Sequence, residues 1–151
     1  MLPDPDLLSR MAAQGTALTP TSSVLQRTVP EVRDRPDSPG RRWYLRGARA
    51  HAPLVAAAAE AGVRILAGTD SLPHGRIVDE VRALAAAGLS HHDALAAASW
   101  SARSYLGLPG LLPNAPADAV VYEEDPRTDL DRLAHPPAAV LRGRPVRVRR
   151  S

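Results

Sequence analysis

The pattern of apolar and polar positions predicts alternating helices and strands over the first two thirds of the chain. Helices are predicted over residues 7–14 and 49–61, each ending just before or at a glycine, and strands over residues 16–21 and 63–67. An amphipathic helix is predicted over residues 76–87. Its apolar stripe consists of Ile77, Val78, Val81 and Leu84, and its polar side of Arg76, Asp79, Glu80 and Arg82. Strands that alternate with helices indicate a parallel sheet or barrel.

The remaining segments have different patterns. Residues 22–47 are rich in Pro, Arg and Asp, and this composition predicts a long surface loop with a helical turn over residues 24–27. The loop could form a lid over a site. Ser90 and Asp93 have capping-box spacing, and helix is predicted to continue through residues 94–98 and 101–106. Beyond Gly107, short strands are predicted over residues 117–122, 138–141 and 145–148, with a turn or short helix at 129–133. These strands predict a small separate sheet.

Length and composition narrow the class of protein. The chain has 151 residues, whereas a complete (β/α)8 barrel needs about 250. It contains no Cys, which excludes disulfides and thiolate metal sites. Its first residues lack the basic and apolar parts of a secretory signal, and no apolar stretch approaches the roughly 20 residues of a membrane span. We therefore expect a cytoplasmic protein that does not bind a membrane.

The basic pI of about 10.1 raises the question of nucleic-acid binding. The net charge is only +3, and the 19 basic residues, all Arg, are mostly scattered among acidic ones. Few aromatic side chains could stack on bases, and no nucleic-acid-binding motif is present. We expect no nucleic-acid partner.

The most informative local feature is Asp70, which follows the apolar strand 63–67 in the sequence Gly68-Thr69-Asp70. A carboxylate at the C-terminal end of a parallel strand lies at the face where active sites of α/β folds form. The tripeptide alone leaves a second interpretation open. Asp70 could instead cap the helix that begins near Arg76, or hold the turn.

Four segments, in this order, resemble the C-terminal portion of the amidohydrolase superfamily, in its imidazolonepropionase-like branch. They are MAAQGTALTPT, AAAAEAGVRILAGTDSLPHG, DEVRALAAAGLSHHDALAAASWSARSYLGL and APADAVVYEEDPRTDLDRLAHPPAAVLRGRPV. The resemblance implies an α/β fold, the C-terminal part of a (β/α)8 TIM-like barrel plus strands of a small composite β-domain. Residues 1–110 would supply the last strands and helices of the barrel, and residues 111–151 the strands of the β-domain.

The resemblance also implies roles for two residues. Asp70 occupies the position after the eighth barrel strand, where the family has a metal ligand that also serves as general base for the attacking water. His74, in the following loop, matches a position near the substrate, although a surface histidine would fit the sequence as well. The implied cofactor is a divalent metal, zinc, in the complete enzyme.

Other parts of the family's metal site have no match in this sequence. The chain has no His-x-His pair and no Lys, which the family uses on its first and fourth strands. His91 and His92 lie beside the capping Ser90, and His51 and His135 are in the wrong segments to replace the missing ligands. Catalytic zinc usually requires three protein ligands. We therefore expect the isolated chain to bind zinc weakly and to show no amidase turnover.

Two functions remain as predictions. The first is a C-terminal fragment of a metal-dependent amidohydrolase, which would hydrolyse a C–N bond of a small-molecule substrate such as a cyclic amide or a dipeptide. The second is a non-catalytic remnant, or a partner subunit that completes a barrel with a separate chain. In either case the partner is the missing N-terminal half or a complementary chain, and exposed strand edges would also favour a homo-oligomer.

Overall fold

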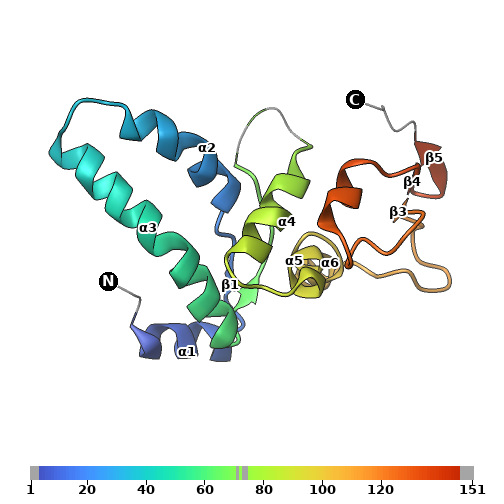
Figure 1. Ribbon diagram of the computed structural model, residues 1–151. Helices are drawn as coiled ribbons and strands as arrows, with labels where there is room; N and C mark the ends of the chain where they lie inside the picture. The colour runs from blue at the N-terminus through green and yellow to red at the C-terminus, as the bar shows by residue number, and fades with distance from the viewer. Residues whose placement is uncertain (1–3, 71, 73–74, 147–151) are drawn as a thin grey trace.

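The computed structural model describes residues 4–70, 72 and 75–146. Figure 1 shows a row of helices beside a short parallel sheet, followed by a second sheet near the C-terminus. The elements, in chain order, are α1 (Pro5–Ala13), β1 (Ala17–Leu18), α2 (Ser22–Arg33), α3 (Pro39–Glu60), β2 (Arg64–Ile65), α4 (Ile77–Ala86), α5 (His91–Ala97), α6 (Trp100–Tyr105), β3 (Ala119–Val121), the 3-10 helix η1 (Leu130–Ala134), β4 (Ala138–Leu141) and β5 (Arg144–Val146). The predicted alternation of helices and strands is confirmed.

The first sheet consists of β1 and β2, which pair in parallel as predicted. Ala17 lies opposite Arg64 and Leu18 opposite Ile65, and Leu66 N–H donates to the Leu18 carbonyl at 2.9 Å. Both strands are shorter than the apolar runs that predicted them. Because parallel strands end at the same edge, the segments after Leu18 and Ile65 lie side by side.

The prediction of a long loop over residues 22–47 is wrong. Residues 22–33 form α2, and α3 begins at Pro39, ten residues before the helix predicted from 49. Proline is favourable at the first position of a helix, and the Ser38 side chain caps α3 by accepting from Arg41 N–H at 3.1 Å. Pro30 lies in the last turn of α2, so only a short stretch of helix follows it.

The two helices form a hairpin, and the side chains of Thr28 on α2 and Tyr44 on α3 are hydrogen bonded across it. Figure 1 shows its turn extending away from the rest of the chain. Among the described residues, none of the helices combines the length and apolar character that a membrane span requires.

The apolar core lies between α3, β2, α4 and α5. Its buried members include Val55, Ala58, Val63, Leu84 and Ala94. Small side chains dominate, as expected from a sequence without Phe. Their small volume lets the backbones of neighbouring helices approach closely.

One residue of α4 contradicts the predicted polar side of that helix. The sequence pattern places Glu80 on the solvent face, but none of its surface is exposed. It lies three residues before Ala83 and four before Leu84, which are both buried, and this spacing places all three side chains on one face of the helix. The helix itself, and the Ser90 cap of the next one, are confirmed: the Ser90 side chain accepts from Asp93 N–H at 3.1 Å.

The second sheet has the order β3-β4-β5 and is antiparallel throughout, which confirms a small separate sheet. Val120 lies opposite Ala139, and Val140 opposite Pro145. The 3-10 helix η1 joins β3 to β4 and confirms the turn or short helix predicted at 129–133. Leu130 and Leu133 of η1 are buried and belong to the core, so η1 attaches this sheet to the helices.

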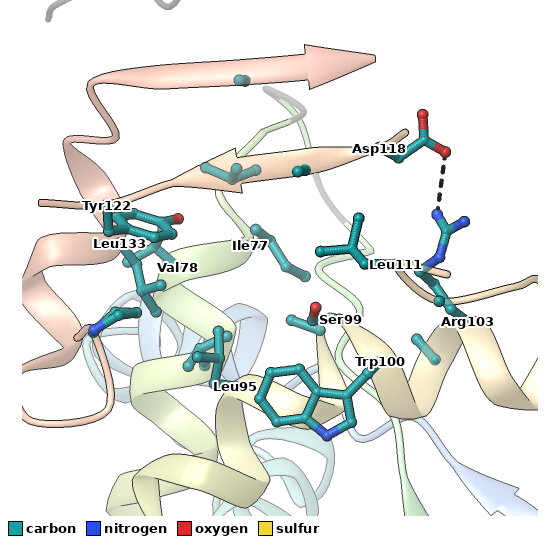
Figure 2. A pocket seen from close by; sticks show the side chains of 18 of the residues that line it. Ile77, Val78, Leu95, Ser99, Trp100, Arg103, Leu111, Asp118, Tyr122 and Leu133 are labelled. Carbon is teal, nitrogen blue, oxygen red and sulfur yellow. Dashed lines mark hydrogen bonds and ion pairs between the residues drawn. The ribbon is translucent and has the colours of Figure 1, made fainter. Parts of the chain in front are cut away.

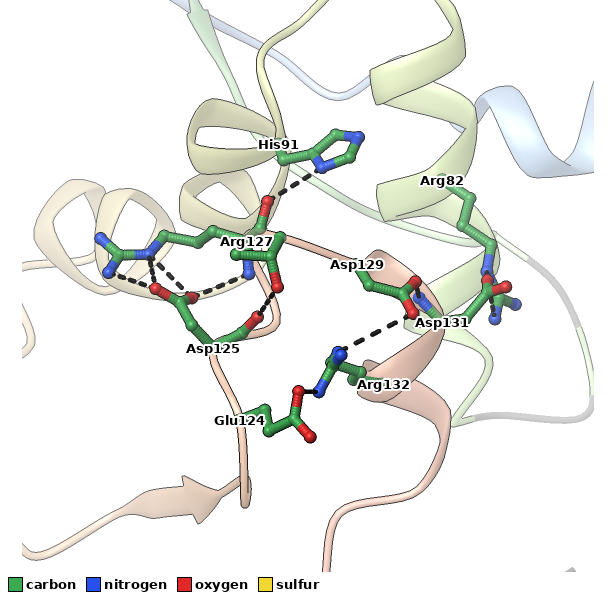
Figure 3. Close-up of polar contacts among 9 residues, drawn as sticks. Arg82, His91, Glu124, Asp125, Arg127, Asp129, Asp131 and Arg132 are labelled. Carbon is green, nitrogen blue, oxygen red and sulfur yellow. Dashed lines mark hydrogen bonds and ion pairs between the residues drawn. The ribbon is translucent and has the colours of Figure 1, made fainter.

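Polar contacts also link this C-terminal segment to α4 and α5, as Figure 3 shows. The Arg82 guanidinium on α4 lies 2.7 Å from the Asp131 carboxylate, and His91 Nδ1 lies 2.9 Å from the Arg127 carbonyl oxygen. Arg127 also donates to Asp125 through its side chain and its backbone N–H, and these bonds lower the pKa of Asp125 to about 2. These residues are exposed, so the contacts orient the segment more than they stabilise it.

Candidate functional site

Asp70 lies beyond the C-terminal end of β2, as the sequence predicts. The chain leaves the strand through residues 66–69, where Ala67 N–H donates to the Ala97 carbonyl at 2.9 Å and ties this segment to the end of α5. Asp70 is exposed and has a left-handed backbone with φ of 41°. Non-glycine residues rarely adopt this conformation, although Asp tolerates it better than most. The bend therefore presents the carboxylate to solvent at the edge of the sheet.

The loops after β1 and β2 are in direct contact at this edge. A Cβ atom added to Gly68 would lie 2.6 Å from Thr19 Cγ2, closer than real side chains approach. Gly68 is thus required for close packing of the two loops. The glycine of the Gly-Thr-Asp sequence brings the segment after β1 close to the segment that leads to Asp70.

A buried polar cluster lies on the helices that follow these loops. The two carboxylate oxygens of Glu80 accept from the backbone N–H groups of Ser22 and Ser23, at 2.8 and 2.7 Å. Ser22 Oγ lies 3.1 Å from His51 Nε2. Burial lowers the pKa of His51, and the nearby negative charge of Glu80 offsets part of that effect. The cluster joins α2, α3 and α4.

Among the described histidines, His51, His91 and His92 contact parts of the chain other than the loop that carries Asp70. His74 lies outside the described residues. The His92 ring packs against Trp100, with ring centroids 5.1 Å apart, and His135 follows η1. Both His91 and His92 are exposed, as predicted.

The metal that the family resemblance implies would need several ligand side chains close together. Among them, no three His, Cys, Asp or Glu side chains lie together in a group that could hold a metal ion. Asp70 fits a single ligand position. The described part of the chain therefore does not form a complete metal site.

A large cavity lies elsewhere, between helices α4 to α6 and the three-stranded sheet. It has a volume of about 1080 Å³, and Figure 2 shows apolar side chains such as Val78, Leu95 and Leu111 facing it. Two charged pairs line it: Arg103 and Asp118, 3.3 Å apart, and Arg127 and Asp125, 2.6 Å apart. Hydrogen bonds from Arg142 N–H and then from Arg103 lower the pKa of Asp118. With its charges paired and its walls apolar, this cavity offers no group poised for hydrolysis, and we take the edge at Asp70 as the candidate site.

Comparison with known proteins agrees with the fold. The family model for the amidohydrolase family matches residues 2–146. The chain belongs to the amidohydrolase family. It is 44% identical over 144 residues to uncharacterized proteins of Mycobacterium tuberculosis (strain ATCC 25618 / H37Rv) and Mycobacterium bovis (strain ATCC BAA-935 / AF2122/97). Each match covers 92% of this chain, which spans 39% of the length of those relatives.

Solved structures give the same result for the fold. An amidohydrolase crystal structure matches with a TM-score of 0.79 and 25% identity, over 95% of this chain and 37% of that one. A Xaa-Pro dipeptidase with bound methionine in its active site matches with a TM-score of 0.82 and 20% identity, with the same coverage. Ochratoxinase of A. niger matches with a TM-score of 0.74 and 23% identity, over 94% and 34%. The fold is the C-terminal part of an amidohydrolase TIM-like barrel.

Sequence reasoning missed the polar cluster of Glu80, Ser22 and His51. One signal was available, since Glu80 interrupts the apolar stripe of α4 between Ile77 and Leu84. A charged residue at such a position must be paired or hydrogen bonded when the helix packs. Its partners lie 57 and 58 residues away in the sequence, and no local pattern identifies them.

Proposed function

We propose that this chain supplies the last part of a metal-dependent hydrolase that cleaves a C–N bond, with Asp70 as its one metal ligand and its general base. The observation that carries the proposal is the exposed Asp70 carboxylate at the C-terminal end of a parallel strand, in a chain of the amidohydrolase family. Active sites of such barrels are built at this face. The substrate class is a small molecule with an amide bond, either a cyclic amide or a dipeptide.

The chemistry divides between the metal and the protein. A divalent cation, which we propose to be zinc, would polarise the scissile carbonyl and lower the pKa of water toward neutrality. The Asp70 carboxylate would take the proton from the attacking water and pass it to the leaving amine. A carboxylate suits this exchange because it can accept a proton and release it again, and the solvent-exposed position of Asp70 leaves it open to substrate and water.

The remaining metal ligands would come from polypeptide that is not among these residues. Asp70 provides one ligand, and catalytic zinc sites usually have three from the protein. The chain also spans only 39% of the length of its curated relatives. We therefore propose that the 151-residue chain is inactive alone.

A second candidate function is completion of a barrel made with a separate chain. The first sheet supports it, because within the described residues β1 and β2 pair only with each other and leave their outer edges free. Unpaired edges are templates for further strands. This function and the first share Asp70, and they differ in whether the other ligands lie on the same polypeptide.

The experiment is to tag the chain at its natural locus, purify it, and measure intact mass, zinc content and hydrolysis of a panel of dipeptides and cyclic amides. We expect bound zinc and hydrolytic activity only in a preparation that contains a polypeptide larger than 16.1 kDa or a second chain. Asp70→Asn should abolish turnover, whereas Asp93→Asn, a helix-capping carboxylate, should leave turnover unchanged.

Four results separate the alternatives. A longer tagged polypeptide with zinc supports a single-chain hydrolase, and a zinc-containing complex of two chains supports the split barrel. Hydrolysis that survives Asp70→Asn, or a purified chain of 16.1 kDa that is active alone, would contradict the proposal.

A further inference from the structure

Glu80 is fully buried and negatively charged in the first turns of α4, yet it makes no ion pair among the contacts of the described residues. Its partners are backbone groups of another helix: Ser22 N–H donates to Oε1 at 2.8 Å and Ser23 N–H donates to Oε2 at 2.7 Å. Burying a carboxylate is costly unless such bonds replace its hydration. The two contacts are therefore strong constraints on the relative position of α4 and the start of α2.

The start of α2 depends on this carboxylate. The preceding residue, Thr21, has a left-handed backbone with φ of 50°, and its side chain makes no capping hydrogen bond. The first N–H groups of a helix have no partners within the helix and carry a partial positive charge. Glu80 supplies from a distant element the acceptors that a capping side chain normally provides.

Both helices follow the loops that meet at the candidate site. Helix α2 follows β1 after only three residues, 19–21, and α4 follows the loop that carries Asp70. The two loops pack without space for a side chain at Gly68, which faces Thr19. A shift of α2 relative to α4 would therefore move Thr19 against Gly68, two residues before Asp70.

We propose that Glu80 is a positioning residue that holds the segment after β1 against the loop carrying Asp70. Its carboxylate fixes the first turn of α2, and the contact between Thr19 and Gly68 passes that constraint to the residues before Asp70. The inference rests on the proposed function only in giving Asp70 a chemical role. The structural coupling between the two loops is independent of it.

The test is hydrogen–deuterium exchange, read by mass spectrometry, on the whole chain and three variants. Glu80→Gln keeps the side-chain size but retains one oxygen acceptor and places an amide N–H₂ against the second donor. Glu80→Ala removes both acceptors. Glu60→Gln is the matched control, because it makes the same chemical change at an exposed position at the end of α3. Circular dichroism checks that each variant is folded.

We expect Glu80→Gln to speed exchange at least about tenfold in two segments, residues 19–24 and 66–70, because it removes one bond to a charged acceptor and weakens the other. Exchange in α5 should stay unchanged, and Glu60→Gln should alter neither segment. A purely structural role would instead speed exchange across the chain, α5 included, through global destabilisation.

Two results would overturn the proposal. One is uniform acceleration across the chain in Glu80→Gln. The other is acceleration limited to residues 19–24 with residues 66–70 unchanged, which would make Glu80 a helix cap without influence on the Asp70 loop. If Glu80→Ala does not fold, the exchange rates of Glu80→Gln in the two segments decide the test. The measurement uses neither metal nor substrate, so its outcome is separate from the success or failure of the proposed hydrolase function.

Discussion

The helical region, residues 4–107, and the C-terminal region, residues 115–146, bury their apolar side chains to very different degrees. Val55 and Leu84 in the helical region have no exposed surface. In the C-terminal region Val120, Leu141 and Val146 are 53%, 56% and 46% exposed. The same kinds of side chain therefore form a closed core in the helical region and lie open on the strands β3 to β5 of the C-terminal region.

The difference shows which part of the chain buries its apolar side chains without further polypeptide. Helices α3, α4 and α5 enclose their own core, while the three-stranded sheet is anchored mainly through Leu130 and Leu133 of η1. Open apolar strands of this kind mark surfaces that other polypeptide covers. The composite β-domain that the family resemblance implies would take its further strands from the missing part of the polypeptide, and this stays a prediction.

The largest expected effect comes from shortening a core side chain in the helical region. Leu84→Ala should lower the free energy of unfolding by about 2–5 kcal/mol, because it removes buried contacts and leaves a cavity. The matched variant Leu141→Ala, on the exposed face of β4, should change it by no more than about 0.5 kcal/mol. Urea unfolding followed by circular dichroism measures both. Equal losses in the two variants would mean that the regions do not differ as described.

A smaller effect concerns pH and the helical region alone. Burial lowers the pKa of His51 below its ordinary value of 6.5, so on acidification the unfolded chain takes up the proton first. His51 therefore favours the folded state above about pH 6.5, and this contribution is lost as the pH falls from there through the lowered pKa.

Urea unfolding of the wild type and of His51→Gln, between about pH 8 and pH 5, isolates this contribution. The wild type should lose more stability than the variant as the pH falls. Gln can still bond to Ser22 but does not titrate, so the hydrogen bond is conserved in the comparison. Parallel pH profiles for the two proteins would show that burial of His51 does not affect stability.

The sequence predicted those elements whose signals are local. The ends of α1 and α4, the Ser90 cap and the strand before Asp70 all follow from spacing within about ten residues. The position of Asp70 at the end of a parallel strand followed in the same way, from one apolar run and one turn. Such features are encoded by residues that are also neighbours in the fold.

Prediction failed where the deciding contacts join residues far apart in the sequence, and where a proline is compatible with both a loop and a helix. The prolines around residues 30–39 suggested a loop, but Pro39 begins α3 and Pro30 falls near the end of α2. Glu80 resembled a solvent-exposed residue of an amphipathic helix because its partners, Ser22 and Ser23, come from an element far away in the sequence. The burial of Glu80 depends on how α2 and α4 pack, which no window of sequence contains.

The most direct test of the central claim is a zinc titration of the purified 151-residue chain and of Asp70→Asn, followed by isothermal calorimetry. If Asp70 is one ligand of a site whose other ligands lie elsewhere, the wild type should bind zinc weakly and without a defined stoichiometry, and Asp70→Asn should bind it more weakly still. Tight binding of one zinc per monomer, unaffected by Asp70→Asn, would contradict the account.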